Sequence, residues 1–287
     1  MKLLVCFGPN GAGKSTTMNM LTGFIEQTEG EIIIDGYNML KKPKKAKREI
    51  GYMPEGVPLY TDLTVKEFVT YMAEIKKVDK KIRKEKVEEI IEQTGLKDVE
   101  KKLTKNLSRG YKQRVSMAGA LVGEPKILIL DEPTVGLDPK QITEIRNLIK
   151  ELGKTHTVIL SSHILSEVSQ ICNKVIIINK GKIVAIDTPE NLENKVASNN
   201  RIYVTVEDPE NKIGTMKDKI QDIEKIELIK DNEDGTKQYS IEAKQDVDLR
   251  KSIFSEFAKE NITIFEMKKA DTTLEDAFMK LIEGGNK

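Results

Sequence analysis

The chain has 287 residues, of which 38% are hydrophobic, so it can build one large domain or two modest domains with a well-formed core. Its 47 basic residues nearly cancel its 46 acidic residues, and this balance argues against nucleic acid as the main partner. No apolar stretch approaches the roughly 20 residues that span a bilayer, so we expect any work at a membrane to go through a partner.

The first predicted element is a strand over the apolar residues 2–7, and a glycine-rich segment follows it directly. Strand, glycine-rich turn and helix start, in this order, match the phosphate-binding pattern GxxxxGK followed by Ser or Thr. The glycines let successive backbone N–H groups point at phosphate oxygens, and the helix beginning near Lys14 adds its positive end. We expect Lys14 to reach the β- and γ-phosphates of a nucleoside triphosphate and the Ser15 hydroxyl to bind Mg²⁺. The candidate nucleotide-binding residues are Gly8, Pro9, Asn10, Gly11, Ala12, Gly13, Lys14, Ser15 and Thr16.

Helix and strand patterns continue along the next segment. A first helix is expected over 16–24, and the β-branched stretch 30–36, bracketed by glycines, indicates a short strand. The basic run 41–48 is expected to be a solvated surface, with a lipid or nucleic-acid patch as the alternative. A further strand over 50–55 reaches a proline near its end.

The segment 63–121 is mainly helical in pattern. Thr64 stands before Glu67 at the spacing of a capping box, which marks a helix start. Charges alternate over 76–92 around a sparse apolar stripe, as on an exposed helix. We therefore expect a helical subdomain over about 56–121 that separates two halves of an α/β core.

Strands and helices alternate in the second half of that core. In chain order, the pattern predicts a buried strand over 126–133, a helix over 141–153, a strand over 157–163, a helix from Leu165 and a strand over 175–178. Such alternation implies a mainly parallel sheet with crossover connections. Residues 1–195 are therefore expected to form one α/β domain.

The pattern changes near residue 200. Residues 201–207 alternate between apolar and polar side chains, as in a half-exposed strand. We expect residues 200–287 to form a small accessory α+β domain, with further strands over 237–243 and 262–268 and helices over 248–260 and 274–282.

Two motifs narrow the class of nucleotide-binding protein. Asp131 and Glu132 end a buried strand, so both carboxylates are expected at the sheet edge where the phosphate loop emerges. We expect Asp131 to hold Mg²⁺ and Glu132 to polarise the attacking water. Upstream, residues 107–114 read Leu-Ser-Arg-Gly-Tyr-Lys-Gln-Arg, and Ser108 and Gly110 at a helix start offer anion-binding groups to a γ-phosphate.

With this pair of motifs the sequence resembles the ATP-binding subunits of ABC transporters, whose signature is LSGGQ. Ser108 and Gly110 match that signature, whereas Arg109 and Tyr111 replace a glycine and the glutamine, as in ATPases of bacterial ABC exporters. The resemblance covers residues 3–188 with several motifs in order. It implies a P-loop NTPase core with a mainly parallel sheet and a helical subdomain, plus a small C-terminal α+β domain.

The resemblance also implies roles for single residues. Glu132 would be the catalytic carboxylate, and His163 the switch histidine at the γ-phosphate. Asp138 lies in the loop that, in this family, links the two active sites across a dimer. Glu55 stands where the family usually has a glutamine that contacts Mg²⁺, and a carboxylate is a hard oxygen ligand that retains this contact. The expected cofactors are ATP and Mg²⁺, and the expected metal ligands are Ser15, Glu55 and Asp131.

The resemblance implies a subunit that powers transport, in the export direction, through a separate integral membrane permease. Two copies, or this chain and a paralogous subunit, would pair head to tail with each ATP between residues 8–16 of one chain and Ser108 and Gly110 of the other. Such a subunit is cytoplasmic and peripheral on the inner face of the cell membrane. A reducing cytosol fits Cys6 and Cys172, which lie in apolar runs and are expected to be buried thiols rather than a disulfide.

Two other functions fit parts of the pattern. Soluble ABC ATPases that act on ribosomes or nucleic acid generally carry two cassettes or a long coiled-coil insertion, and neither is visible here. A nucleotide-sensing module that hydrolyses poorly is compatible with Glu55 and Arg109. A measurement of ATP turnover distinguishes such a module from a working ATPase.

Family members usually carry further strands before the phosphate-loop strand, with an aromatic side chain that stacks on adenine. The sequence begins at Met1, inside that strand. Either this start is a truncation or an internal Met taken as the start, or the protein manages without the aromatic side chain. If the sequence is complete, stacking worth roughly 1 kcal/mol is missing, and we expect weaker nucleotide affinity and a less stable domain than in relatives. The tail segment 273–278 resembles the C-terminal extensions of exporter-type ATPases, which would support dimer contacts or regulation.

Overall fold

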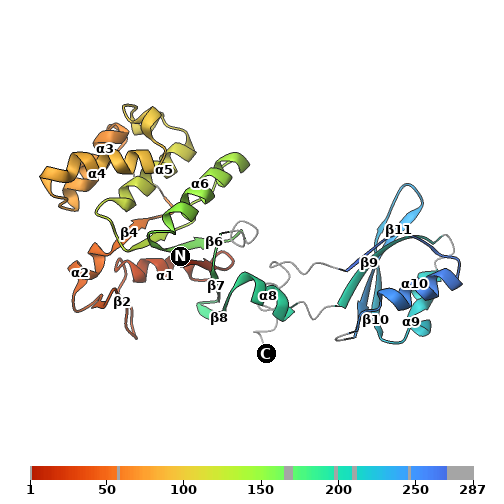
Figure 1. Cartoon of the computed structure of the whole chain (residues 1–287). Helices are drawn as coiled ribbons and strands as arrows, with labels where there is room; N and C mark the ends of the chain where they lie inside the picture. Colours follow the sequence, from red (N-terminus) through yellow and green to blue (C-terminus); the bar gives the residue numbers. More distant parts are fainter. Residues whose placement is uncertain are drawn as a thin grey trace. The chain divides into compact units, whose positions relative to one another are not determined.

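The computed structural model describes residues 2–56, 59–164, 171–196, 200–208, 212–244 and 247–269 (Figure 1). The chain divides into two compact units, the first ending at Pro189 and the second beginning at Glu190. The helices expected from Leu165 and over 274–282, like the tail segment 273–278, lie outside the described residues.

The first unit is built on a six-stranded sheet. Neighbouring strands run parallel except for the last pair, β7 and β8. Along the sheet the order is β4 (Ile50–Met53), β5 (Ile127–Leu130), β6 (Thr157–Ser162), β1 (Lys2–Phe7), β7 (Lys174–Asn179) and β8 (Lys182–Asp187). The prediction of an α/β fold with a mainly parallel sheet is confirmed.

The parallel strands end together at one edge of this sheet. Met53 pairs with Leu130, Leu130 pairs with Leu160, and Phe7 pairs with Ser162. Because parallel strands present their carboxyl ends at the same edge, the residues that follow β1, β4, β5 and β6 meet there. This edge positions the candidate site.

The boundaries of two elements differ from the expectation. Helix α1 runs over Lys14–Leu21 rather than 16–24. It ends early because Gly23 adopts a left-handed φ of 66° and its N–H bonds to the carbonyl of Met20 at 3.0 Å. Strand β8 was not expected, because its side chains are largely exposed and lack the continuous apolar pattern of a buried strand.

Helices α3 (Val65–Ile75), α4 (Lys80–Gln93) and α5 (Arg109–Leu121) gather at one end of the first unit (Figure 1). Helix α3 packs against both α4 and α5, and α5 also packs on β4. These helices provide the mainly helical segment that the sequence predicts between β4 and β5.

Shorter elements complete the first unit. Strands β2 (Ile33–Ile34) and β3 (Tyr37–Asn38) form a two-stranded antiparallel pair, and the basic run 41–48 contains helix α2 (Pro43–Arg48). Helix α6 (Pro139–Leu152) begins at a proline, which suits the first position of a helix. Helix α8 (Pro189–Val196) follows β8 and begins at the division between the units.

The start of α3 is fixed by a capping box, as predicted. The Thr64 hydroxyl accepts a hydrogen bond from the Glu67 N–H at 3.2 Å, and the Glu67 carboxylate accepts the Thr64 N–H at 2.8 Å. These hydrogen bonds lower the pKa of Glu67, first through the backbone N–H and then through the hydroxyl of Thr64. The cap therefore satisfies backbone donors that the first helical turn leaves open.

We expect Thr64→Ala to lower the free energy of unfolding by about 1 kcal/mol at neutral pH, measured by urea unfolding. Because the folded-state pKa of Glu67 is lowered, its part of the stabilisation is present above the unfolded pKa and is lost as the pH falls through the folded pKa. The difference in the free energy of unfolding between wild type and Thr64→Ala should therefore shrink at acidic pH. Thr143→Ala is the matched control, since Thr143 lies exposed inside α6; an equal loss there would contradict the capping account.

The second unit is a four-stranded antiparallel sheet. Its strands lie in the order β10 (Ile223–Asp231), β11 (Thr236–Ala243), β9 (Asn200–Glu207) and β12 (Thr263–Lys269), and its helices are α9 (Met216–Lys219) and α10 (Arg250–Lys259). Val204, Ile253 and Phe257 are fully buried in its core. Strand β10 was not expected, because most of its side chains are exposed and two register shifts break its alternation.

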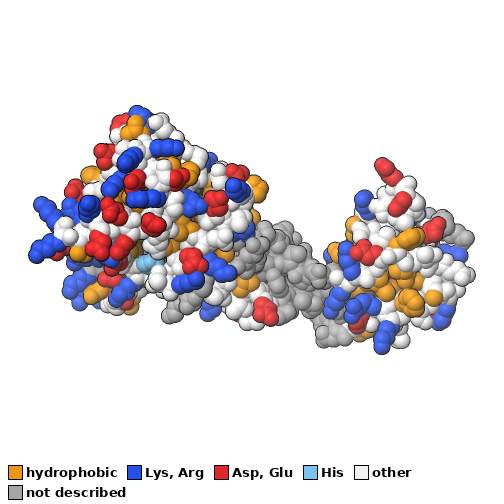
Figure 2. Space-filling view, turned by 45° about the horizontal axis from the view of Figure 1, so that its top comes forward, with side chains coloured by type: hydrophobic (Ala, Val, Ile, Leu, Met, Phe, Trp, Pro, Cys, Tyr) orange, Lys and Arg blue, Asp and Glu red, His pale blue; other side chains and the backbone are white. Residues whose placement is uncertain are grey.

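The surface charge follows the composition, whereas the prediction of buried cysteines holds for Cys6 and only in part for Cys172, which is half-buried. Side chains of both charges are interspersed over the face of the first unit seen in Figure 2. Cys6 and Cys172 are free thiols, and burial raises the pKa of each to about 11. Among the residues that the structure describes, none of the helices combines the length and the apolar character that a membrane span requires.

Candidate active site

The phosphate loop curls around the ammonium group of Lys14. Lys14 is 6% exposed, and its Nζ donates to the carbonyl oxygens of Gly8 at 2.8 Å and Pro9 at 3.3 Å. Gly13, with a φ of 106°, turns the chain into α1. A side chain at Gly8 could not be accommodated, because its Cβ would lie 2.3 Å from the carbonyl oxygen of Ile178. The loop is thus preformed around a buried cation, as a phosphate site requires.

A cavity of about 530 Å³ opens at the carboxyl edge of the sheet. It is lined by Asn10, Gly11, Gly13, Lys14, Ser15, Thr16, Glu55, Glu132, Val135 and His163. The structure therefore brings together the expected phosphate-loop residues and the side chains that follow β4, β5 and β6. Its volume lies in the range of small-ligand sites.

Glu132 is the central carboxylate of this cavity. Its Oε1 lies 3.7 Å from Lys14 Nζ and its Oε2 lies 2.9 Å from His163 Nδ1, while the side chain is almost buried. Its backbone adopts a left-handed φ of 49°, which is uncommon for a residue with a side chain. Strain of this kind persists where the surrounding structure enforces it, as at active sites. Glu132 is therefore held between a fixed cation and a histidine.

Ser161 is a site residue that the sequence analysis did not identify. Its Oγ donates to Asp131 Oδ1 at 2.5 Å and accepts the N–H of Glu132 at 2.8 Å. Asp131 is 3% exposed and does not line the cavity itself. Ser161 thus fixes the orientation of both acidic residues, and its sequence signal is the pair Ser161 and Ser162 that precedes His163 at the end of a strand.

The donor set fits a magnesium nucleotide. Ser15, Glu55 and Asp131 offer hard oxygen atoms, and the backbone of the loop and Lys14 offer donors for phosphate. Within the described ranges, no group of three or more His, Cys, Asp and Glu side chains is arranged to hold a metal ion alone. Mg²⁺ commonly keeps several waters and is bound by one or two carboxylates together with substrate phosphates.

Six expected nucleotide contacts do not line the cavity of their own chain: Gly8, Pro9 and Ala12 within the phosphate loop, and Ser108, Gly110 and Asp138 outside it. Ser108 is exposed and caps α5, with its Oγ 3.5 Å from the N–H of Tyr111. Asp138 caps α6 by accepting the N–H of Gln141 at 2.9 Å. Gly110 is buried against α6, where an added Cβ would lie 2.9 Å from the Gln141 side chain. Ser108, Gly110 and Asp138 therefore each have a local structural role in addition to any contact with a second chain.

A phosphate loop, an acidic pair and a histidine at one edge of a parallel sheet define a P-loop ATPase. The family model described as ABC transporter matches residues 1–135. A second model, described as an AAA domain and putative AbiEii toxin of a type IV toxin–antitoxin system, matches residues 105–169, which include α5, the acidic pair and His163.

Curated relatives extend the match over nearly the whole chain. The bacitracin transport ATP-binding protein BcrA of Bacillus licheniformis is 37% identical over 281 residues, which cover 97% of this chain and 87% of BcrA. The linearmycin resistance ATP-binding protein LnrL of Bacillus subtilis is 36% identical over 200 residues, which cover 69% of this chain and 64% of LnrL. The chain belongs to the family of ABC transporter ATP-binding proteins.

Solved structures agree with this assignment. The protein cbiO1 from Clostridium perfringens, part of the ABC transporter complex cbiONQ, has a TM-score of 0.62 and 31% identity, covering 68% of this chain and 81% of its own. A dimeric post-hydrolysis structure of the ATP-binding cassette MJ0796, bound to ADP and Pi, has a TM-score of 0.59 and 27% identity, covering 65% and 85%. The prediction of an ATPase subunit that powers transport is confirmed, and the ribosomal and sensing alternatives are not favoured.

Proposed function

We propose that this chain pairs head to tail with a second copy or with a paralogous ATPase subunit, so that each ATP lies between two chains. The observation that carries this proposal is that the expected nucleotide contacts lie in two separate places on one chain. Lys14, Glu132 and His163 share one cavity, whereas Ser108 and Gly110 do not line it. A second chain would bring its own α5 start, with that helix's positive end, onto the γ-phosphate. The dimeric MJ0796 cassette supports this arrangement by similarity.

Hydrolysis follows from the charges around Glu132. Nucleotide phosphates would draw the Lys14 ammonium away from the carbonyls of Gly8 and Pro9. The Glu132 carboxylate accepts a proton from a water that attacks the γ-phosphorus, and the bond from that phosphorus to the bridging oxygen of ADP breaks. His163 holds Glu132 Oε2 in position and lies at the cavity for contact with the γ-phosphate. Ser15, Glu55 and Asp131 would hold Mg²⁺, which would supply charge neutralisation for the phosphates.

We place the subunit on the inner face of the cell membrane, bound to an integral membrane permease in an exporter. BcrA is named for bacitracin transport and LnrL for linearmycin resistance, and the resistance role of LnrL supports export as the direction. Contacts with the transported molecule belong to the permease. No nucleic acid partner is needed for this function.

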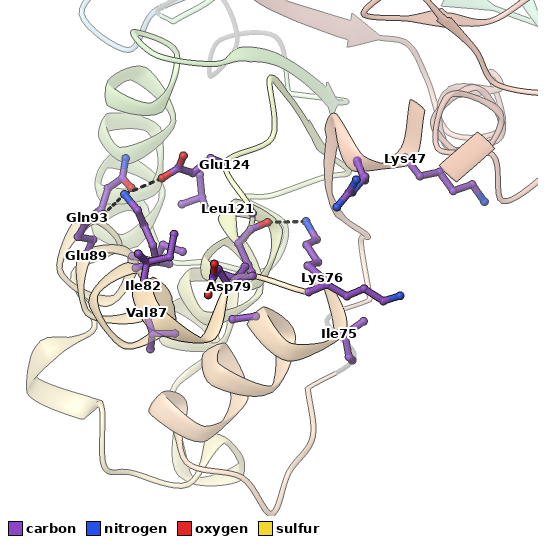
Figure 3. A pocket seen from close by; sticks show the side chains of 18 of the residues that line it. Lys47, Ile75, Lys76, Asp79, Ile82, Val87, Glu89, Gln93, Leu121 and Glu124 are labelled. Atoms are coloured by element: carbon purple, nitrogen blue, oxygen red, sulfur yellow. Dashed lines mark hydrogen bonds and ion pairs between the residues drawn. The ribbon is translucent and has the colours of Figure 1, made fainter. Parts of the chain in front are cut away.

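A groove on the first unit suits the permease as its partner. The groove has a volume of about 790 Å³ and lies among α2, α3, α4 and the end of α5. Ile75 and Ile82 expose apolar surface there, with Lys47 on one side and Glu89 and Glu124 on the other (Figure 3). Glu89 and Glu124 both pair with Lys86, so the apolar strip lies within a mainly basic lining. Such a strip fits a short amphipathic helix of the membrane subunit.

Lys76 links this groove to the end of α5. Its Nζ donates to the carbonyl oxygens of Val122 at 2.9 Å and Ala120 at 3.3 Å, at the end of α5. A lysine at this position satisfies carbonyls that the last helical turn leaves open. Burial lowers the pKa of Lys76 to about 8. A helix pressed into the groove would therefore act directly on α5, the helix that begins with Ser108.

The test is co-purification. The chain is expressed with the membrane proteins encoded beside it, extracted in mild detergent, and assayed for bound membrane protein and ATPase rate. We expect a stable membrane partner that stimulates hydrolysis, and we expect Ile82→Asp to reduce its recovery roughly tenfold because an unpaired charge would be buried. Ile183→Asp is the control, since Ile183 is also an exposed isoleucine but lies on β8. Recovery on ribosomes or nucleic acid instead would contradict the proposal.

A further inference from the structure

A run of basic side chains borders the groove proposed for the permease. Residues 41–48 contain six lysine and arginine residues, whereas the whole chain carries a net charge of only +1. Helix α2 occupies the second part of the run, and all six basic side chains are exposed. Lys44, Lys47 and Arg48 line the groove, and the other three do not. None of these residues takes part in the ATPase chemistry described above.

The positive charge of this run is not neutralised by the protein. Over the described ranges of the chain, none of the six basic side chains forms an ion pair with a carboxylate. Lys47 Nζ donates to the Gly23 carbonyl oxygen at 2.9 Å, and Lys45 Nζ lies 5.6 Å from the centre of the Tyr37 ring. Like charges three and four positions apart on a helix repel one another. A negatively charged partner would therefore relieve repulsion that the chain itself leaves in place.

An exposed leucine stands at the start of the run. Leu40 is 48% exposed and lies in the turn that follows β3. Asn38 fixes this turn, because its side-chain Oδ1 accepts the N–H groups of Leu40 and Lys41, each at 3.0 Å, and its carbonyl oxygen accepts the N–H of Lys42 at 2.8 Å. The turn therefore presents an apolar side chain together with two lysines.

We propose that residues 40–48 bind anionic lipid headgroups on the membrane surface beside the permease. A cluster of roughly four to eight Lys and Arg side chains is typical of segments that bind anionic lipids, and an apolar side chain among them adds burial at the boundary of the headgroups. Five of the six basic residues are lysines. Their compact ammonium groups on flexible stems suit a diffuse layer of phosphates, whereas arginine suits bidentate recognition of a single carboxylate.

The place of the run on the first unit suits a lipid contact. The run shares α2 with the groove, so a subunit that binds the permease there would hold residues 40–48 near the membrane. Two contacts with one surface reinforce each other, because the second forms at a high effective concentration. The lipid contact therefore retains the subunit at the membrane when its hold on the permease weakens. The inference rests on the proposed function for this placement alone.

The test is cosedimentation of the full chain with vesicles of phosphatidylcholine alone and with vesicles that contain an equal amount of phosphatidylglycerol. We expect preferential binding to the phosphatidylglycerol vesicles, and this binding should weaken as salt is raised. The triple variant Lys41→Gln, Lys42→Gln, Lys45→Gln should lower the partition coefficient roughly 100-fold, because each lysine near an anionic surface contributes about fivefold. These lysines do not line the groove, so the loss is independent of the permease. Leu40→Ser should lower the coefficient severalfold.

The matched control is the triple variant Lys150→Gln, Lys154→Gln, Lys174→Gln, which removes three exposed positive charges elsewhere on the first unit and should keep the wild-type partition coefficient. Equal binding to neutral and anionic vesicles, or an unchanged coefficient in the first triple variant, would overturn the inference. Lost recovery of the permease with unchanged vesicle binding would instead assign the run to the permease. Each of these outcomes leaves the ATPase assignment intact, and failure of co-purification is what contradicts the proposed function.

Discussion

Glu132→Gln is expected to lower the rate of ATP hydrolysis by roughly 10²- to 10⁴-fold while ATP binding persists. Glutamine keeps the size and an oxygen for His163, but it cannot accept the proton of the attacking water. It also removes a negative charge that lies 3.7 Å from Lys14, so the phosphates meet less repulsion and ATP is retained longer. Phosphate release and retained nucleotide, measured on the same preparation, separate these effects.

Glu151→Gln is the control for that experiment. Glu151 is exposed and pairs with Lys154 on the surface, so this variant changes charge in the same way without touching the cavity. Its rate should equal that of wild type. Hydrolysis that survives Glu132→Gln at more than about a tenth of the normal rate would assign the general base to another group.

Lys14→Met is expected to weaken binding of magnesium ATP roughly 100-fold, because charge-assisted hydrogen bonds to phosphate are worth about 3 kcal/mol together. Methionine retains the length and packing of the stem but offers no donor. In this fold the loss is direct, since Lys14 is the cation around which the Gly8 and Pro9 carbonyls are arranged. Titration calorimetry gives the dissociation constant.

The control for Lys14→Met is Lys154→Met, because the Lys154 amine is exposed and bonds to Glu151 on the surface. Its dissociation constant should match that of wild type. The unfolding midpoint without nucleotide shows whether each variant is folded. A folded Lys14→Met chain with unchanged affinity would exclude the phosphate-loop assignment.

The location of the site was predictable from the sequence because it depends on strand ends. Glu55, Glu132 and His163 each follow a buried apolar run, and parallel strands carry such residues to one edge. The phosphate loop follows a fourth apolar strand, β1, and lies at the same edge of the sheet. Local motifs with a fixed spacing, such as the capping box at Thr64, could also be predicted from the sequence.

Other features depended on packing that spacing does not encode. Ser161 is identifiable only once β5 and β6 are adjacent, because its hydroxyl spans Asp131 and the Glu132 N–H. The burial of Gly110 under Gln141 likewise requires α5 and α6 to be placed together. Strand β10 escaped prediction because strand pairing, rather than burial of its own side chains, holds it in the sheet.

The most direct test of the account is complementation between two defective chains, because the central claim is a site shared by two chains. A Lys14→Met chain and a Ser108→Arg chain are co-expressed with the permease under different tags, and complexes carrying both tags are assayed. Head-to-tail pairing places both defects in one site and leaves the other intact, so each mixed complex should recover up to about half of the wild-type rate. Complexes no more active than either variant alone would contradict the shared site.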